Sequence, residues 1–226
     1  MNNSLIYTGL FVGQVIILFF VSKVTIQELF YFFRIFFRRE QVVFSLISFL
    51  FLPGTILHEM AHFLMATILL LRVGEIKIFP VWEKNYIRLG HVLYEKKDVI
   101  RGILVGIAPV IAGLLFFWGL GVSHLFPSTN IWLNVLLGYL IFVVSSTMFS
   151  SKQDMVDIIF ILPVLVFVGL GLYIFQFDFS QLLRADNVFV IRFNEFLYGI
   201  NFYILLSLFI HGIVIGVIKV VRLKFH

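Results

Sequence analysis

Residues 53–65 read Pro-Gly-Thr-Ile-Leu-His-Glu-Met-Ala-His-Phe-Leu-Met, and this stretch decides the fold. It places His58, Glu59 and His62 inside a long apolar segment, Val42–Leu71. Because about 20 mostly apolar residues are enough to cross a bilayer, the segment predicts a membrane helix. Its length allows the helix to tilt or bend, and Pro53-Gly54 predicts where the kink lies.

The rest of the sequence has the composition of a membrane protein. Of the 226 residues, 61% are hydrophobic, 13% are charged and 29 are phenylalanine. Soluble domains have roughly 25% charged residues, so lipid is the expected surrounding for most of this chain. The net charge of +5 fits membrane orientation and contact with lipid headgroups. No basic stretch is interleaved with base-reading polar residues, so we expect no nucleic-acid partner.

Six apolar segments predict an α-helical polytopic membrane protein in which residues 1–226 form a single membrane domain. The segments are Leu5–Val21, Val42–Leu71, Ile103–Val122, Ile131–Phe149, Met155–Phe177 and Phe196–Ile218. Between the first two, Lys23–Gln41 mixes phenylalanines with arginines, which predicts a helix lying in the membrane interface. The first segment lacks a preceding positive charge and a cleavage site, so we interpret it as a retained span.

A more polar segment after the second span predicts a β-hairpin at about residues 73–94. Polar and apolar side chains alternate within Gly74–Phe79 and Tyr86–Tyr94, which predicts two strands. Gly90 is expected to weaken or bulge the second strand. With six spans, lysines and arginines concentrate on the face that carries this hairpin and both ends of the chain. We therefore expect a multi-pass protein, in the cell membrane if the source is prokaryotic, with both termini cytoplasmic.

The pattern His-Glu-x-x-His at His58–His62 predicts a zinc site. On a helix, residues four apart share one face, so both imidazoles can bind a single Zn²⁺. Glu59 lies about 100° around the helix, which suits a general base that takes a proton from zinc-activated water. Roughly 0.005 chance occurrences are expected in a chain of this composition. Burying ionisable groups at bilayer depth costs free energy. A bound metal compensates for that cost more simply than hydrogen bonds from neighbouring helices do.

A third protein ligand must come from elsewhere, because zinc in catalytic sites has three protein ligands and the chain has no cysteine. Asp154 and Asp157 open the apolar segment after the fourth span and are the candidates. Ser151 and Asp154 also fit a helix-capping box, but that role leaves Asp157 unexplained. We favour Asp154 as the ligand and expect one zinc per chain.

These features together resemble the site-2 protease family of intramembrane metalloproteases. The resemblance rests on His58–His62 within a span, the hairpin after it, the small-residue segment Gly106–Gly113 and a later aspartate. It implies hydrolysis of membrane-spanning or membrane-associated protein substrates. This chain departs from the family where an Asn-Pro and Asp-Gly context is usual, since it has Ser-Ser-Lys-Gln-Asp at 150–154.

The hairpin is a candidate substrate-binding element, because an unwound membrane helix needs new partners for its backbone groups and a strand edge supplies them. The alternative is a solvated linker between two spans. The candidate substrate-binding residues are Ile76, Ile78, Ile87 and Leu89.

Other polar residues have less specific interpretations. His211, in the last predicted span, is better explained by a hydrogen bond to a neighbouring helix than by metal binding. We expect His91 and His124 to be solvated, and Thr55, Asn134 and Asn201 either line a cavity or bridge helices.

Two other function classes compete with a zinc metalloendopeptidase. A membrane metal-ion transporter would also use paired histidines, but it needs polar residues along a path through both leaflets. A metal-binding scaffold without protease activity is the third reading, and the intact His58, Glu59 and His62 argue against it. The substrate and the oligomeric state are not encoded in any recognisable pattern.

Overall fold

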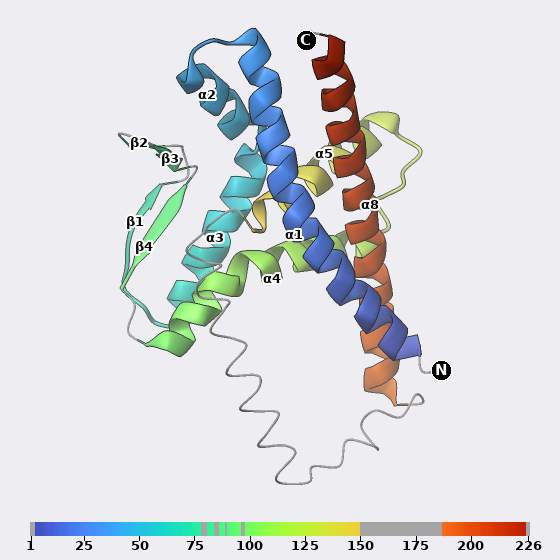
Figure 1. The fold of residues 1–226 in the computed structure, drawn as a ribbon. Helices are drawn as coiled ribbons and strands as arrows, with labels where there is room; N and C mark the ends of the chain where they lie inside the picture. The colour runs from blue at the N-terminus through green and yellow to red at the C-terminus, as the bar shows by residue number, and fades with distance from the viewer. Residues whose placement is uncertain are drawn as a thin grey trace.

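The computed structural model describes residues 3–77, 81–83, 86–88, 90–95, 98–149 and 187–224. Over these ranges the chain is mostly helical, with a small β region beside α3 (Figure 1). The elements in chain order are α1 (Asn3–Phe36), α2 (Glu40–Leu50), α3 (Leu52–Ile68), β1 (Val73–Lys77), β2 (Val81–Glu83), β3 (Tyr86–Arg88), β4 (His91–Tyr94), α4 (Val99–Ser123), α5 (Ile131–Thr147) and α8 (Val188–Lys224).

Three helices, α1, α4 and α8, are long and apolar enough to cross a membrane, and the bent pair α2–α3 makes a fourth if it counts as one span. The described part of the chain therefore has fewer spans than the six that we predicted. The difference has two sources. α5 coincides with a predicted span but has only 17 residues, and Met155–Phe177 lies outside the described residues.

The predicted kink in the second apolar segment is confirmed. Phe51 lies between the end of α2 and the start of α3, and the two helices are bent by 70° relative to each other. Pro53 lies in the first turn of α3, where a missing N–H costs little because first-turn donors have no intrahelical acceptor. Gly54 brings α3 against α5: a Cβ there would lie 2.5 Å from Thr147 Oγ1 and 2.7 Å from the Val143 carbonyl oxygen. The missing side chain allows this close helix packing.

The predicted interfacial helix over Lys23–Gln41 is not separated from the first apolar segment in the structure. α1 continues unbroken to Phe36, so Lys23 and Glu28 lie within one long helix. The Lys23 ammonium sits 4.0 Å from the centre of the Phe19 ring. Glu28 pairs with Arg222 of α8 at 2.8 Å. These contacts give partners to charges that, in the sequence alone, look like the end of a membrane span.

α1 and α8 run side by side in the same direction (Figure 1). Tyr7 meets Tyr198, Thr25 meets His211 and Glu28 meets Arg222, so the paired residues rise together along both helices. The ends of the chain consequently lie at opposite ends of this helix pair. If both helices cross the bilayer, the termini face opposite sides, which differs from our prediction that both are cytoplasmic.

The predicted hairpin is confirmed over its described residues, although it forms two short ladders. β1 pairs antiparallel with β4, and β2 pairs antiparallel with β3. The predicted second strand is divided, since Gly90 lies between β3 and β4. The register irregularity occurs in β1, between Val73 and Ile76. Val73 and Tyr94 pack near Val105, which attaches the base of the hairpin to α4.

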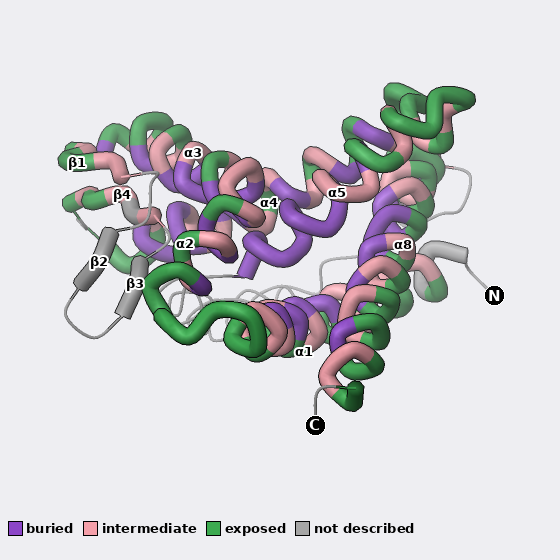
Figure 2. The backbone as a smooth tube through the Cα atoms, turned by 90° about the horizontal axis from the view of Figure 1, so that it is seen from above, coloured by how far each residue is buried: buried purple, intermediate pink, exposed green. Residues whose placement is uncertain are grey.

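The main apolar core lies where α1, α4, α5 and α8 meet. Leu18, Phe117, Ile141 and Ile200, one from each helix, are fully buried there. Figure 2 shows that the buried surfaces of α3, α4, α5 and α8 face the interior of the bundle, while outward faces are exposed. An exposed apolar exterior is what a lipid-facing bundle presents.

Candidate metal centre

His58, Glu59 and His62 are all buried on α3. Their exposed fractions are 4%, 5% and 7%. α3 lies between α4, α5 and the β1–β4 hairpin, so each face of the motif meets a different element (Figure 1). Three ionisable side chains are thus held together in the interior of the described bundle.

The two imidazoles face each other. Their ring centroids are 4.7 Å apart with an interplanar angle of 85°, and the two Nε2 atoms are 3.1 Å apart. A tetrahedral zinc with bonds of about 2.0–2.1 Å holds two nitrogen ligands about 3.3 Å apart. The observed spacing is close to that value, so this donor pair fits zinc.

His62 is oriented by α4. Its Nδ1 donates a hydrogen bond to the carbonyl oxygen of Val105 at 2.8 Å. In a regular helix this carbonyl accepts from the residue four positions later, but that residue is Pro109, which has no N–H. The proline thereby leaves the Val105 carbonyl open to an outside donor. The hydrogen bond fixes the proton on Nδ1 and leaves Nε2 as the nitrogen that can bind a metal.

Glu59 lies directly beneath the hairpin at Gly90. A Cβ built on Gly90 would be 2.8 Å from both Cγ and Oε1 of Glu59. The base predicted from the motif is therefore covered by backbone from the loop between β3 and β4. α3 and the hairpin together define where this carboxylate can stand.

The predicted third ligand lies beyond these contacts. Asp154 and its alternative Asp157 are outside the described residues. Within the described ranges, no further His, Asp or Glu completes a group of three with the two histidines. Of the candidate substrate-binding residues, Ile76 lies in β1 opposite Val92 and Ile87 in β3 opposite Trp82. Ile78 and Leu89 lie outside the described residues.

His211 is a structural histidine, as predicted. Its Nδ1 is 2.8 Å from the Thr25 hydroxyl of α1, and its Nε2 is 3.2 Å from the Ser145 hydroxyl of α5. One fully buried ring therefore links three helices. Asn201 also bridges helices, because its amide donates to the Tyr7 carbonyl at 3.0 Å.

The remaining polar residues have local roles. The Thr55 hydroxyl donates to the Phe51 carbonyl in its own turn. Asn134 holds the loop before α5 through two hydrogen bonds with the backbone of Ser128. His124 ends α4 in a left-handed conformation and is exposed.

Two features of the site were missed from the sequence. One is the Val105 carbonyl, for which Pro109 is a usable signal, because a proline inside a helix marks an open carbonyl four residues earlier. The other is the contact between Gly90 and Glu59, for which the sequence contains no signal beyond the glycine itself.

Comparison with protein-family profiles, with curated proteins and with solved structures gave no match. The function proposed below therefore rests on the residues of this chain and on the resemblance carried by its motif.

Proposed function

We propose that the protein is an integral membrane zinc metalloendopeptidase that hydrolyses peptide bonds of membrane-spanning or membrane-associated proteins. The observation that carries the proposal is the geometry of His58 and His62. Their Nε2 atoms lie 3.1 Å apart, and the Nδ1 of His62 is committed to a backbone carbonyl. A zinc ion bound there supplies Lewis acidity, which activates water and polarises the scissile carbonyl group.

Glu59 has the role of general base. Its carboxylate takes a proton from the attacking water and passes it to the leaving amine. The neighbouring position on the helix places it beside the two ligands, and its burial under the hairpin keeps bulk water away from the carboxylate. Asp154 is proposed as the third zinc ligand, with Asp157 as the alternative.

The hairpin is proposed to hold the substrate in an extended form. A membrane helix hides its scissile carbonyl in its own hydrogen bonds, so it must unwind before hydrolysis. β1 and β4 pair only with each other among the described strands, which leaves one edge of each strand for an added strand. This hairpin also approaches Glu59, at Gly90.

A membrane metal-ion transporter and an inactive metal-binding scaffold are the alternatives. A transporter needs successive polar sites along a path across the membrane. Two other buried polar side chains, His211 and Asn201, make hydrogen bonds between helices. Because these side chains are engaged in packing the helices, the structure favours a single metal site over a transport pathway across the membrane.

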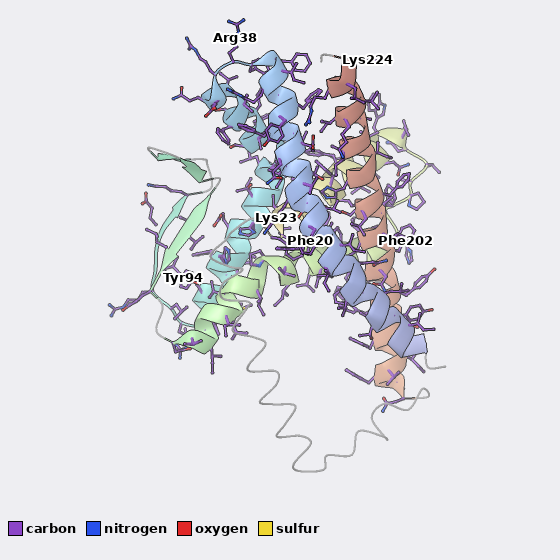
Figure 3. The ribbon with its side chains drawn as sticks, viewed as in Figure 1. Phe20, Lys23, Arg38, Tyr94, Phe202 and Lys224 are labelled. Atoms are coloured by element: carbon purple, nitrogen blue, oxygen red, sulfur yellow. The ribbon has the colours of Figure 1, made fainter. Side chains whose placement is uncertain are left out.

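The sidedness of the chain follows from its charge. The last turns of α1 and α8 lie at the same end of the molecule, where Figure 3 shows Arg38 and Lys224. The basic residues at this end are Arg34, Arg38, Arg39, Lys219, Arg222 and Lys224. Of these, Arg34 pairs with Glu40 and Arg222 pairs with Glu28. The described basic residues at the other end are fewer: Arg72, Arg101, which pairs with Asp98, and Arg192, which pairs with Glu195. Positive charge collects on the cytoplasmic side, so we place the C-terminus there and the N-terminus on the opposite side.

Single cysteines test this orientation, because the natural chain has none. In intact cells, a membrane-impermeant maleimide is expected to label Asn3→Cys. The Lys224→Cys variant should be labelled only after the cells are permeabilised. Equal labelling of both variants in intact cells would contradict the proposed topology.

The proposed activity is tested with purified protein, by metal analysis together with cleavage of a defined single-span peptide. We expect one zinc per chain in the wild type. His58→Ala and His62→Ala should lose the metal, whereas Glu59→Gln should retain it and lose turnover. Undiminished cleavage by Glu59→Gln would refute the mechanism. Zinc binding by a wild type that cleaves no peptide would favour the scaffold or the transporter.

A further inference from the structure

A close contact between the hairpin and the motif helix is made by a residue with no side chain, Gly90. A Cβ on Gly90 would lie 2.8 Å from Glu59 Cγ and Oε1, and 3.0 Å from Cδ. Non-bonded carbon atoms prefer separations of about 3.5–4.0 Å. Any residue other than glycine at position 90 would therefore have to displace either the carboxylate or the hairpin.

Space, and not backbone conformation, requires this glycine. No glycine among the described residues has a positive φ, so residues with a side chain can also adopt the backbone conformation of Gly90. Gly74 on β1 provides a comparison within the same hairpin. A Cβ there would meet the Leu93 carbonyl oxygen at 3.5 Å, which is ordinary contact. The tight approach is thus a property of position 90 and not of the hairpin in general.

Of the two partners, the Glu59 side chain can shift more easily than the hairpin, because the atoms that a Cβ at position 90 would meet all belong to that side chain. Glu59 is 5% exposed and lies in the middle of α3. The hairpin is fixed at its base, where Val73 and Tyr94 pack in the cluster of Ala66 and Val105. A Cβ at position 90 would therefore move the Glu59 carboxylate and leave the hairpin in place.

We propose that Gly90 is the positioning residue for Glu59. The hairpin packs directly on the general base, and the absence of a side chain at position 90 determines the position of the carboxylate. The catalytic consequence of this inference rests on the proposed peptidase function. The contact between Gly90 and Glu59 does not depend on that function. Misplacing a catalytic group by about 1 Å can cost 10²-fold in rate. A methyl group at position 90 should displace Glu59 on that scale.

The contact is tested first without reference to activity. Glu59→Cys and Gly90→Cys are introduced together into the cysteine-free chain. One C–C bond separates Glu59 Cβ from Cγ, so the two Cβ atoms are at most about 4.3 Å apart, within disulfide range. After oxidation in the presence of a metal chelator, both thiols should become unreactive to maleimide and should return with reductant. The matched pair Glu59→Cys with Gly74→Cys should keep both thiols. Two reactive thiols in the Gly90 pair would overturn the inference, whatever the activity.

The catalytic consequence is tested with Gly90→Ala, which should lower kcat between 10- and 100-fold and leave zinc content unchanged. Gly74→Ala should behave as wild type. Glu59→Asp withdraws the carboxylate by one methylene group, so adding it to Gly90→Ala should cost less than adding it to the wild type. Equal kcat for Gly90→Ala and wild type, or strictly additive effects in the double variant, would overturn the positioning role. A disulfide in a chain whose wild type cleaves nothing would instead refute the proposed function and leave the contact standing.

Discussion

Replacing Pro109 with alanine should weaken zinc binding and, at the same time, stabilise the helix that contains it. The substitution restores an N–H four residues after Val105, within reach of the carbonyl that now accepts from His62. The helix then competes with the imidazole for the same oxygen. Proline inside a helix costs about 3 kcal/mol, so α4 itself should gain stability from the change.

The size of the loss in zinc affinity follows from the single hydrogen bond at stake. A neutral hydrogen bond contributes about 0.5–1.5 kcal/mol net, which corresponds to about 2- to 13-fold in a binding constant. Removing a partner that orients a metal-ligating histidine typically costs 10–100-fold in metal affinity. We therefore expect about a tenfold weaker zinc affinity in Pro109→Ala, because the two ranges overlap near that value.

The assay is competition with a chelator of known zinc affinity, in detergent, alongside thermal unfolding of the metal-free protein. Val110→Ala is the matched control, since it removes side-chain carbons from the next position without adding a backbone donor. General misfolding would lower both the thermal stability and the zinc affinity. The expected result is different, because Pro109→Ala should have equal or higher stability and a lower zinc affinity. A Pro109→Ala protein that is folded and binds zinc as tightly as the wild type would refute the orienting role of the Val105 carbonyl.

Three further predictions concern the ligand set and the packing. Asp154→Asn should reduce zinc occupancy more than Asp157→Asn does, and the reverse ranking by metal analysis would move the third ligand one turn along the chain. His211→Phe should keep zinc and lower the free energy of unfolding by about 1 kcal/mol, because its hydroxyl partners also bond to their own helices; loss of zinc would make His211 a ligand. Gly54→Ala should cost about 1–3 kcal/mol in unfolding experiments, because its Cβ meets the α5 backbone. Gly138→Ala, with nothing nearby, is the control, and equal stability of the two variants would contradict the close packing.

Local features of the fold were predictable from the sequence because they depend on neighbouring residues. The apolar run around the motif predicts a helix, and Pro53 predicts the bend between α2 and α3. Alternating residues predict the hairpin. Each of these inferences uses residues within a few positions of one another, where backbone propensity and periodicity act directly.

Features that depend on distant residues were not predictable in the same way. The first span was predicted to end at Val21, but α1 continues to Phe36, and Glu28 within it has its partner 194 positions away in Arg222. The parallel course of α1 and α8 is likewise invisible to counts of charged loops, which assume that every apolar segment crosses the membrane once. Gly90 is separated from Glu59 by the whole hairpin, so only the folded structure reveals what its missing side chain is for.

Two buried histidines show how partners decide the role of a residue type. Both ring nitrogens of His211 face hydroxyl groups of neighbouring helices, so its hydrogen-bonding capacity is used within the bundle. His62 donates a hydrogen bond from Nδ1 to the Val105 carbonyl oxygen, and its Nε2 faces the Nε2 of His58 at 3.1 Å. Two nitrogen atoms at that distance need a proton or a cation between them, because their lone pairs otherwise repel. A zinc ion fits in the place of that proton without moving either ring far. For this reason we propose the α3 pair, and not His211, as the metal site.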